Sequence, residues 1–186
     1  MEEKTFERID FTLNPLAKDE YVECTFIHCD LSNADLTGMV FMECVFENCN
    51  LSSAVLTNTA FRDITFNNCK MLGLHFENCN QFNLSFTMDA CNLSHSSFYR
   101  VKIRKTTFNS VKLHEVDFTE CDLSGSVFAA CDLAGATFDK TILEKADFRT
   151  SFNYSIAPER NRITKARFSS AGLAGLLDTY DIEICP

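Results

Sequence analysis

The sequence predicts a solenoid, a chain wound into stacked coils with a corner at every fifth residue. The first observation is a period of five: from Leu93 to Phe148 every fifth residue is large and apolar, without a miss. A helix, with its period of 3.6 residues, would scatter these positions around its axis, and a strand, with a period of two, would place alternate members on opposite faces. The period therefore indicates a repeat architecture rather than either regular element.

The second observation is that the position two places before each large residue usually holds a small side chain. In the same segment these positions hold Cys91, Ser96, Val101, Thr106, Val111, Val116, Cys121, Ser126, Cys131, Ala136, Thr141 and Ala146. The simplest geometry that buries one large and one small side chain per five residues, and leaves the other three near water, is a coil that turns at every pentapeptide.

The third observation is a period of 20 on top of the period of five. Large residues of one type recur 20 apart, and the series continues after a two-residue insertion. The phenylalanine column is Phe6, Phe26, Phe46, Phe66, Phe86, Phe108, Phe128, Phe148 and Phe168, and the neighbouring one is Leu31, Leu51, Met71, Leu93, Leu113 and Leu133. Side chains 20 residues apart stack if one coil holds four pentapeptides, so the column predicts a structural core of superposed rings.

Three segments carry a resemblance to a known family: Cys121–Gly125, Cys131–Gly135 and Ala146–Phe148. They resemble the pentapeptide-repeat family, whose pattern is a small residue, Asp or Asn, Leu or Phe, a polar residue and a variable one. The resemblance covers nearly the whole chain. It implies an all-β solenoid, the right-handed quadrilateral β-helix with four pentapeptides per coil.

The repeat predicts where the chain changes character. We expect residues 1–152 to form the β-helix, with a two-residue bulge near 87–90, where the spacing from Phe86 to Leu93 is seven instead of five. The range 153–162 loses the period and contains Pro158, so it is predicted to be a loop. The range 163–186 is predicted to hold the last coil, a capping α-helix and a dimerisation tail that ends in a short strand.

The ten cysteines fit the repeat rather than a disulfide or zinc framework. Nine of them occupy the small slot two places before a central residue, and Cys185 alone lies outside it. The pairs that are close in sequence, such as Cys24 with Cys29, are five apart and fall on neighbouring corners, unlike the Cys-x-x-Cys spacing of zinc sites. Free cysteine behaves as a small buried hydrophobe, so we expect no metal and no disulfide.

The C-terminal tail predicts a dimer contact. Ser169 and Ser170 can cap a helix, and apolar residues then recur at helical spacing before an alternating end; these are Leu173, Leu176, Leu177, Tyr180, Ile182 and Ile184. The end of a solenoid must be covered, and a short helix would hardly bury all of them. The tail, with Cys69–Gly73, also resembles the quinolone- and albicidin-resistance branch of the family. That resemblance implies a homodimer joined through the C-terminus and binding to DNA gyrase.

The net negative charge comes entirely from the N-terminal half of the chain. The net charge is -9 with a pI near 4.9, and residues 1–90 carry 14 Asp and Glu against 5 Lys and Arg while residues 91–186 carry 12 against 12. Over the roughly 19 Å of four coils, at about 4.8 Å per coil, duplex DNA carries about 11 charges. An acidic surface at Glu23, Glu43 and Asp63, stacked 20 apart, is therefore a candidate DNA-like binding surface, and nucleic acid itself is not expected as a ligand.

The sequence contains no motif that predicts an enzyme. There is no nucleotide loop, nucleophile elbow or paired-histidine motif, so no catalytic residue and no cofactor is expected. The start of the chain lacks the regions of a signal peptide and no apolar run could span a membrane, which predicts a cytoplasmic protein. A binding role then remains: a DNA mimic that occupies DNA gyrase or a related topoisomerase and shields it from an inhibitor.

A rival interpretation is a scaffold for another protein partner. A basic patch in the second half, made of Arg100, Lys102, Arg104, Lys105 and Lys112, would then be the recognition face, and the acidic half would serve solubility. In a dimer joined at the C-termini this patch would lie near the middle, where an acidic surface is expected for gyrase contact. The sequence leaves both interpretations open.

Overall fold

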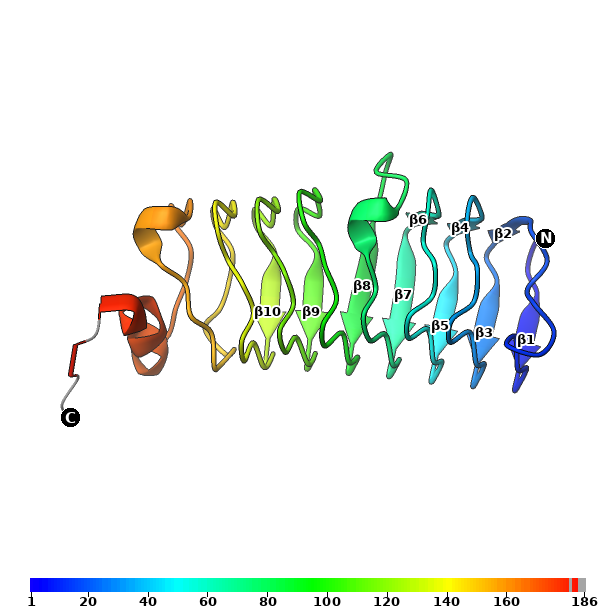
Figure 1. The fold of residues 1–186 in the computed structure, drawn as a ribbon, viewed down its shortest axis with the longest axis horizontal. Helices are drawn as coiled ribbons and strands as arrows, with labels where there is room; N and C mark the ends of the chain where they lie inside the picture. The colour runs from blue at the N-terminus through cyan, green and yellow to red at the C-terminus, as the bar shows by residue number, and fades with distance from the viewer. Residues whose placement is uncertain (181, 184–186) are drawn as a thin grey trace.

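The computed structural model describes residues 1–180, 182 and 183 and shows a straight rod of stacked coils. Residues 1–7 and residues 170–180 lie at opposite ends of the rod (Figure 1). Each coil contributes short parallel strands to its neighbours, so the chain is a parallel β-solenoid, as the period predicted. Within these described residues no helix has the length and apolar character needed to cross a membrane.

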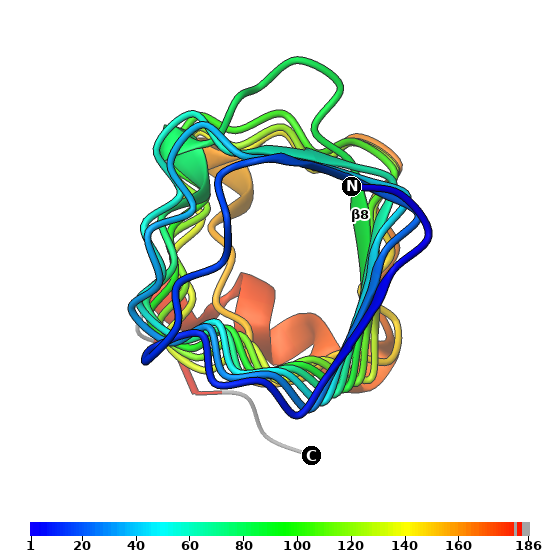
Figure 2. The same cartoon turned by 90° about the vertical axis from the view of Figure 1, so that its right-hand side faces the viewer.

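Two parallel sheets form adjacent sides of the solenoid. The seven-stranded sheet contains β1 (Thr5–Glu7), β3 (Thr25–Ile27), β5 (Val45–Glu47), β7 (Ile64–Asn67), β8 (Phe86–Asp89), β9 (Thr107–Asn109) and β10 (Val127–Ala129). The three-stranded sheet contains β2 (Glu20–Val22), β4 (Val40–Met42) and β6 (Ala60–Arg62). Viewed end-on, the coils superpose into a four-sided outline (Figure 2). Isolated bridges such as Asn50 with Lys70 continue the parallel pairing on the other sides.

The corners are made by residues with positive φ two places after a central residue. Examples are Glu43 (φ 53°), Asn48 (φ 54°) and Gly125 (φ 70°). This left-handed region suits glycine and asparagine and is uncommon for other residues. The chain accepts the conformation at nearly every corner because the ladder of hydrogen bonds between coils fixes the backbone on both sides.

The core is a set of superposed rings, as the period of 20 predicted. Phe26 and Phe46 stack at 4.6 Å between centroids, Phe46 and Phe66 at 5.2 Å, and Phe128 and Phe148 at 4.6 Å. Each of these rings is fully buried. Burying a phenylalanine contributes about 1.5–3 kcal/mol, so repetition of this one contact supplies much of the stabilisation between coils.

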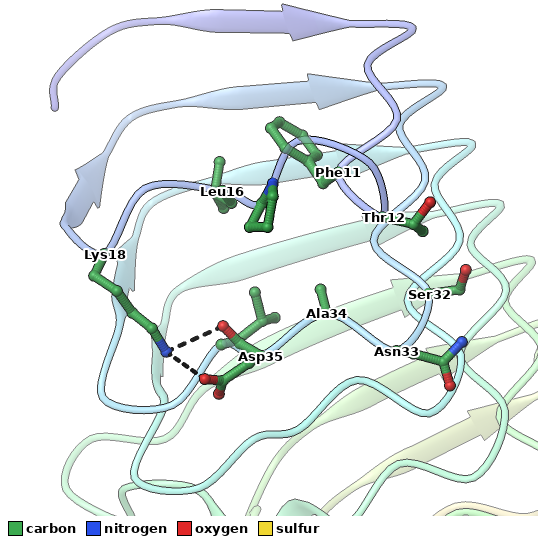
Figure 3. Close-up of a pocket in the computed structure, with 10 residues that line it drawn as sticks. Phe11, Thr12, Leu16, Lys18, Ser32, Asn33, Ala34 and Asp35 are labelled. Atoms are coloured by element: carbon green, nitrogen blue, oxygen red, sulfur yellow. Dashed lines mark hydrogen bonds and ion pairs between the residues drawn. The ribbon is translucent and has the colours of Figure 1, made fainter.

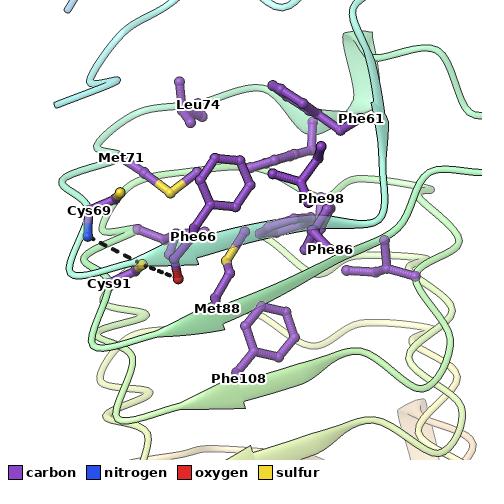
Figure 4. Close-up of a cluster of buried hydrophobic side chains, with 14 of the residues drawn as sticks. Phe61, Phe66, Cys69, Met71, Leu74, Phe86, Met88, Cys91, Phe98 and Phe108 are labelled. Atoms are coloured by element: carbon purple, nitrogen blue, oxygen red, sulfur yellow. Dashed lines mark hydrogen bonds between the residues drawn. The ribbon is translucent and has the colours of Figure 1, made fainter. Parts of the chain in front are cut away.

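The expected position of the two-residue insertion is wrong, and with it one member of the ring column. In the ladder Phe66 pairs with Met88, and Met88 with Phe108, so Met88 and not Phe86 lies in the column. Figure 4 shows Met88 between the two phenylalanines. Phe86 pairs with Ile64 instead. Either residue supplies an apolar side chain near the expected spacing, and only the hydrogen-bond register distinguishes them.

The insertion lies before β8 rather than at 87–90. The amide of Asn80 still donates to the Thr59 carbonyl, 21 residues back as in the regular coils, whereas the Ser85 carbonyl accepts from Ile64 with the longer offset. The extra residues therefore lie in the segment 81–84, which projects from the rod as a loop (Figures 1 and 2). Phe82 on this loop is 68% exposed, so the core below it is undisturbed.

The nine described cysteines are buried, as predicted, and none of them is joined to another in a disulfide. Their thiols take part in a regular contact: Cys49 Sγ donates to the Phe26 carbonyl at 3.3 Å. Hydroxyls in the same slot make the same contact, with Ser126 donating to Ile103 at 3.1 Å and Thr141 to Phe118 at 2.8 Å. Small residues with a donor fit this slot because they add a hydrogen bond to a carbonyl of the preceding coil. Cys185 lies outside the described residues.

The segment predicted as a loop, 153–162, contributes to the core as well as to the surface. Tyr154 and Ile156 are buried, and the Asn161 amide donates to the carbonyls of Phe138 and Ala157, each at 3.0 Å. A 3₁₀ turn, η2 (Pro158–Arg160), lies between these residues. An earlier one is η1 (Phe76–Asn78). The five-residue period is therefore lost because the geometry of the coil changes here. Only part of the segment is an exposed loop.

The C-terminal helix is of the 3₁₀ type, not the expected α type. It comprises η3 (Ser170–Leu176) followed by η4 (Asp178–Tyr180). Gly172 and Gly175 both pack against Tyr154, where a Cβ would come within 2.0 Å and 2.2 Å of its atoms. A helix with three residues per turn places residues three apart on one side, so both glycines meet the ring. The expected terminal strand falls partly outside the described residues, and Ile182 and Glu183 are in no strand.

Candidate protein-binding surface

The three predicted acidic residues lie on one corner of the rod. Glu23, Glu43 and Asp63 directly follow β2, β4 and β6, whose register superposes them on successive coils. All three are exposed and have positive φ. The amides of Glu23 and Glu43 donate at 2.9 Å to carbonyls of the next coil. The sequence prediction that they share one corner is thus met in the structure, whereas their binding role stays a prediction.

The structure adds Glu3 to this corner. Its φ is 50°, and its amide donates to the Val22 carbonyl at 3.0 Å, the same contact that Glu23 makes to Met42. The spacing of 20 between Glu3 and Glu23 is the signal in the sequence that could have placed Glu3 on this corner. We call Glu3, Glu23, Glu43 and Asp63 the acidic column.

Within the described chain the carboxylates of the acidic column form no ion pair with a basic side chain. In the described part of the chain, the side chains of Glu3, Glu23 and Glu43 take part in no ion pair and no hydrogen bond, and Asp63 accepts one from the Ser85 hydroxyl at 2.9 Å. Coils are spaced by about 4.8 Å, and two like charges at that distance repel by about 1 kcal/mol in water before screening. The column is a surface that a cationic partner would stabilise.

Two of the five residues of the predicted basic patch are neutralised by ion pairs within the described chain. Arg100 forms an ion pair with Glu120 at 2.8 Å, and Arg104 with Asp122 at 2.6 Å. These pairs raise the pKa of both guanidinium groups. Burial alone would raise the pKa of the Asp122 carboxyl, but its bonds to Arg104 and Ser124 outweigh burial and lower it. The two arginines therefore connect neighbouring coils, which weakens the case for a recognition face there.

The tail residues predicted for dimerisation divide into two groups. Leu176 packs against the core. Four others remain exposed, at 49% for Leu173, 37% for Leu177, 51% for Tyr180 and 55% for Ile182. The Tyr180 hydroxyl donates to Glu159 at 2.9 Å, which fixes the end of η4 on the last coil. Ile184 lies outside the described residues.

A groove of about 460 Å³ lies beside the first coil (Figure 3). Phe11 and Leu16 lie along it, and Lys18 closes one end through bonds to the Asp35 carboxylate at 2.9 Å and its carbonyl at 3.2 Å. Hydrogen bonds from Thr37 and from Lys18 lower the pKa of Asp35 to about 2. The lysine is thus occupied, and the groove reflects the irregular first coil. No group of three or more potential metal ligands occurs among the described residues.

Comparison with known proteins identifies the repeat. The family model described as "Pentapeptide repeat region" matches residues 20–88 and 74–148, more than half of the chain. The solved structure of full-length QnrB1, "a plasmid-mediated fluoroquinolone resistance protein", aligns with a TM-score of 0.52 at 18% identity, covering 98% of this chain and 99% of that one. A trypsin-treated QnrB1 variant aligns with a TM-score of 0.50 at 20% identity, covering 100% and 99%. Among curated proteins no sequence matches the chain. At these identities the structural likeness shows a common fold.

Proposed function

The chain belongs to the pentapeptide-repeat family, and from that premise we propose that it is a non-enzymatic cytoplasmic protein that binds a type II topoisomerase such as DNA gyrase. It would occupy the enzyme as a DNA-like surface and protect it from inhibitors. The acidic column carries the proposal: four carboxylates stand on successive coils, and three of them have no partner within the described chain. A cationic DNA-binding groove is the kind of surface that would stabilise them.

Two further observations support this function. The fold matches that of a fluoroquinolone resistance protein along the whole length of both chains. The interior is filled by stacked rings and buried aliphatic side chains, so the binding surface is expected on the outside of the rod. The rival basic face is less favoured because Arg100 and Arg104 are already paired with carboxylates.

The test is a supercoiling assay with DNA gyrase and a fluoroquinolone, with and without the protein. We expect the protein to relieve inhibition. A variant that neutralises the acidic column, Glu23→Gln with Glu43→Gln and Asp63→Asn, should lose this effect. The matched control is Glu7→Gln with Glu47→Gln and Asp89→Asn, which removes the same charge from the outer face of the seven-stranded sheet. Equal loss in both variants would refute a specific column, and no relief by the unmodified protein would refute protection.

We also propose that the protein is a homodimer joined at its C-terminal ends. The apolar patch of Leu173, Leu177, Tyr180 and Ile182 is exposed, and Ile184, beyond the described residues, was predicted to extend it. Burial of such a patch is the ordinary driving force of association. In sedimentation at high salt, where contacts between surface charges are screened, Leu173→Glu with Leu177→Glu should give a monomer, whereas Leu13→Glu with Val55→Glu, at exposed apolar positions of the N-terminal half, should not. A wild-type monomer would contradict the proposal.

A further inference from the structure

The corner that carries the acidic column continues along the whole rod. Ile64 pairs with Phe86 and Met88 with Phe108, so the ladder superposes Asp63, Ser85 and Lys105. Beyond them, the amides of Lys105, Gly125 and Lys145 donate to the next coil at 2.9, 2.8 and 3.0 Å, as Glu43 does. The complete corner column is Glu3, Glu23, Glu43, Asp63, Ser85, Lys105, Gly125, Lys145 and Lys165.

The two signs of charge on this corner are fully separated. The four residues before Ser85 are all carboxylates, and the charged residues after it are all lysines, with Gly125 uncharged among them. Within the described chain none of the lysines Lys105, Lys145 and Lys165 forms an ion pair. The corner is therefore a strip of unpaired charge that changes sign at its centre.

Other corners arrange charged residues differently. At one of them, residues of opposite sign follow one another on successive coils and pair, as Arg100 does with Glu120 at 2.8 Å. The corner column has no such pairs between its successive coils. The charges of the corner column have no partner within the described chain, so a partner would have to come from another molecule.

We propose that the corner column is a self-complementary interface that binds a second copy of the rod side by side and antiparallel. With a two-fold axis at Ser85, each level of one rod meets the level equally far from Ser85 on the other. Asp63 then faces Lys105, Glu23 faces Lys145 and Glu3 faces Lys165, and the symmetry repeats each pair. An isologous contact of this kind closes on itself and buries no unmatched charge of the strip except Glu43, which faces Gly125.

The projecting loop fits this arrangement. It ends at Ser85, so it lies beside the two-fold axis, and both copies present it on the same side of the contact. Phe82 is 68% exposed there, with the Arg62 guanidinium 5.7 Å from its ring centroid. Two such loops would place apolar surface at the centre of a contact that is otherwise ionic.

The side-by-side dimer would bury the carboxylates that the proposed function presents to a topoisomerase. The two states would therefore compete, and self-association would hold the protein in a form unable to bind its target. The interface itself follows from the corner column alone and does not depend on which target is correct.

The test is a charge-exchange experiment on the full chain, in the Leu173→Glu, Leu177→Glu background that removes end-to-end contact. One variant carries Glu23→Lys with Asp63→Lys, and the other Lys105→Glu with Lys145→Glu. In a pure sample of either variant the antiparallel contact sets like charges against each other, whereas in the mixture every altered position faces its opposite. Analytical ultracentrifugation in low salt should show association for the parent, at least a tenfold weaker association for each variant alone, and restored association for the equimolar mixture.

Matched controls move the same charges to other faces: Glu7→Lys with Glu47→Lys, and Lys112→Glu with Lys140→Glu. These should associate as the parent does, and circular dichroism should confirm the fold of every variant. A monomeric parent, controls as weak as the test pair, or folded variants whose mixture does not associate would each overturn the proposal. The association experiment contains no topoisomerase. A failure to protect gyrase in the supercoiling assay would therefore not affect the evidence for the side-by-side dimer, and a failure to associate would not affect the evidence for protection.

Discussion

The N-terminal and C-terminal halves of the rod share one core and use charge in different ways. The ring stack is the same in both, with 4.6 Å between Phe26 and Phe46 and 4.6 Å between Phe128 and Phe148. In the C-terminal half ion pairs such as Arg104 with Asp122 connect successive coils. In the N-terminal half the corner carboxylates have no such partner within the described chain. Ring stacking and the backbone hydrogen-bond ladder therefore hold the N-terminal coils together without ion pairs at this corner, and the charge there is free to serve binding.

The largest expected effect tests whether the ring stack contributes equally to stability in the two halves. Phe46→Ala and Phe128→Ala each remove one ring from the middle of a stack, and we expect each to lower the free energy of unfolding by about 3–5 kcal/mol. Urea denaturation followed by circular dichroism measures both. A loss confined to one half would show that the halves differ in more than charge.

The next largest effect tests whether a paired carboxylate contributes more to stability than an unpaired one. Asp122 is buried and accepts hydrogen bonds from Arg104 at 2.7 Å and Ser124 Oγ at 2.6 Å. Asp122→Asn should therefore lower the free energy of unfolding by about 1–3 kcal/mol. Glu43→Gln removes only a repelling charge and should change stability by less than about 0.5 kcal/mol. If denaturation gave Glu43→Gln the larger loss, the acidic column would have a structural role instead.

Acid should weaken the C-terminal half through its paired carboxylates. Hydrogen bonds from Arg149 lower the pKa of Asp147, and the bonds of Asp122 to Arg104 and Ser124 outweigh its burial and lower its pKa too. A depressed folded-state pKa adds stability above the unfolded value of about 3.9, and this stability is lost as pH falls through the folded pKa. Denaturation midpoints measured from pH 6 to pH 2 should fall less for the Asp122→Asn, Asp147→Asn variant than for the wild type. Parallel curves would contradict the linkage.

The smallest effect concerns the small inward slot, which is cysteine-rich in one half and mixed in the other. Cys49 and Ser126 donate to equivalent carbonyls at 3.3 and 3.1 Å. Exchanging them, as Cys49→Ser and Ser126→Cys, should each change stability by less than about 1 kcal/mol because the hydrogen bond is kept. Cys49→Ala, which loses the donor, should cost more in the same denaturation experiment.

Thiol chemistry gives a second measure of the slot. Burial raises the pKa of Cys44 and of Cys131 to about 11, so both thiols stay protonated at neutral pH and are poor nucleophiles. A thiol reagent should label neither in the folded protein. Labelling of Cys44 at the rate of a free thiol would show that the N-terminal coils open.

The coil could be predicted from the sequence because equivalent inward positions of successive coils hold the same type of side chain. The ring column and the cysteine slot were found in this way. Met88 was not, because Phe86 lies at the expected spacing and the insertion shifts the register by two within a few residues. The same shift hid the lysine part of the corner column, since Lys105 follows Asp63 by 42 residues and not 40.

The C-terminal cap was predicted only in outline. Leucines spaced by three and four fit an α-helix as well as a shorter 3₁₀ helix, and the sequence does not say what the helix packs against. Gly172 and Gly175 decide the geometry through their contact with Tyr154, a residue in the segment predicted as a loop. Their spacing of three was the available signal.

The loop at 81–84 shows how the architecture tolerates added length. The ladder resumes at Ser85 with the same parallel pairing that it had at Asn80, and the core column passes beneath without a gap. A peptide grafted into this segment would be displayed away from the rod at a fixed height. Coils of this kind could thus acquire new recognition elements by insertion between faces, leaving the pitch of the scaffold unchanged.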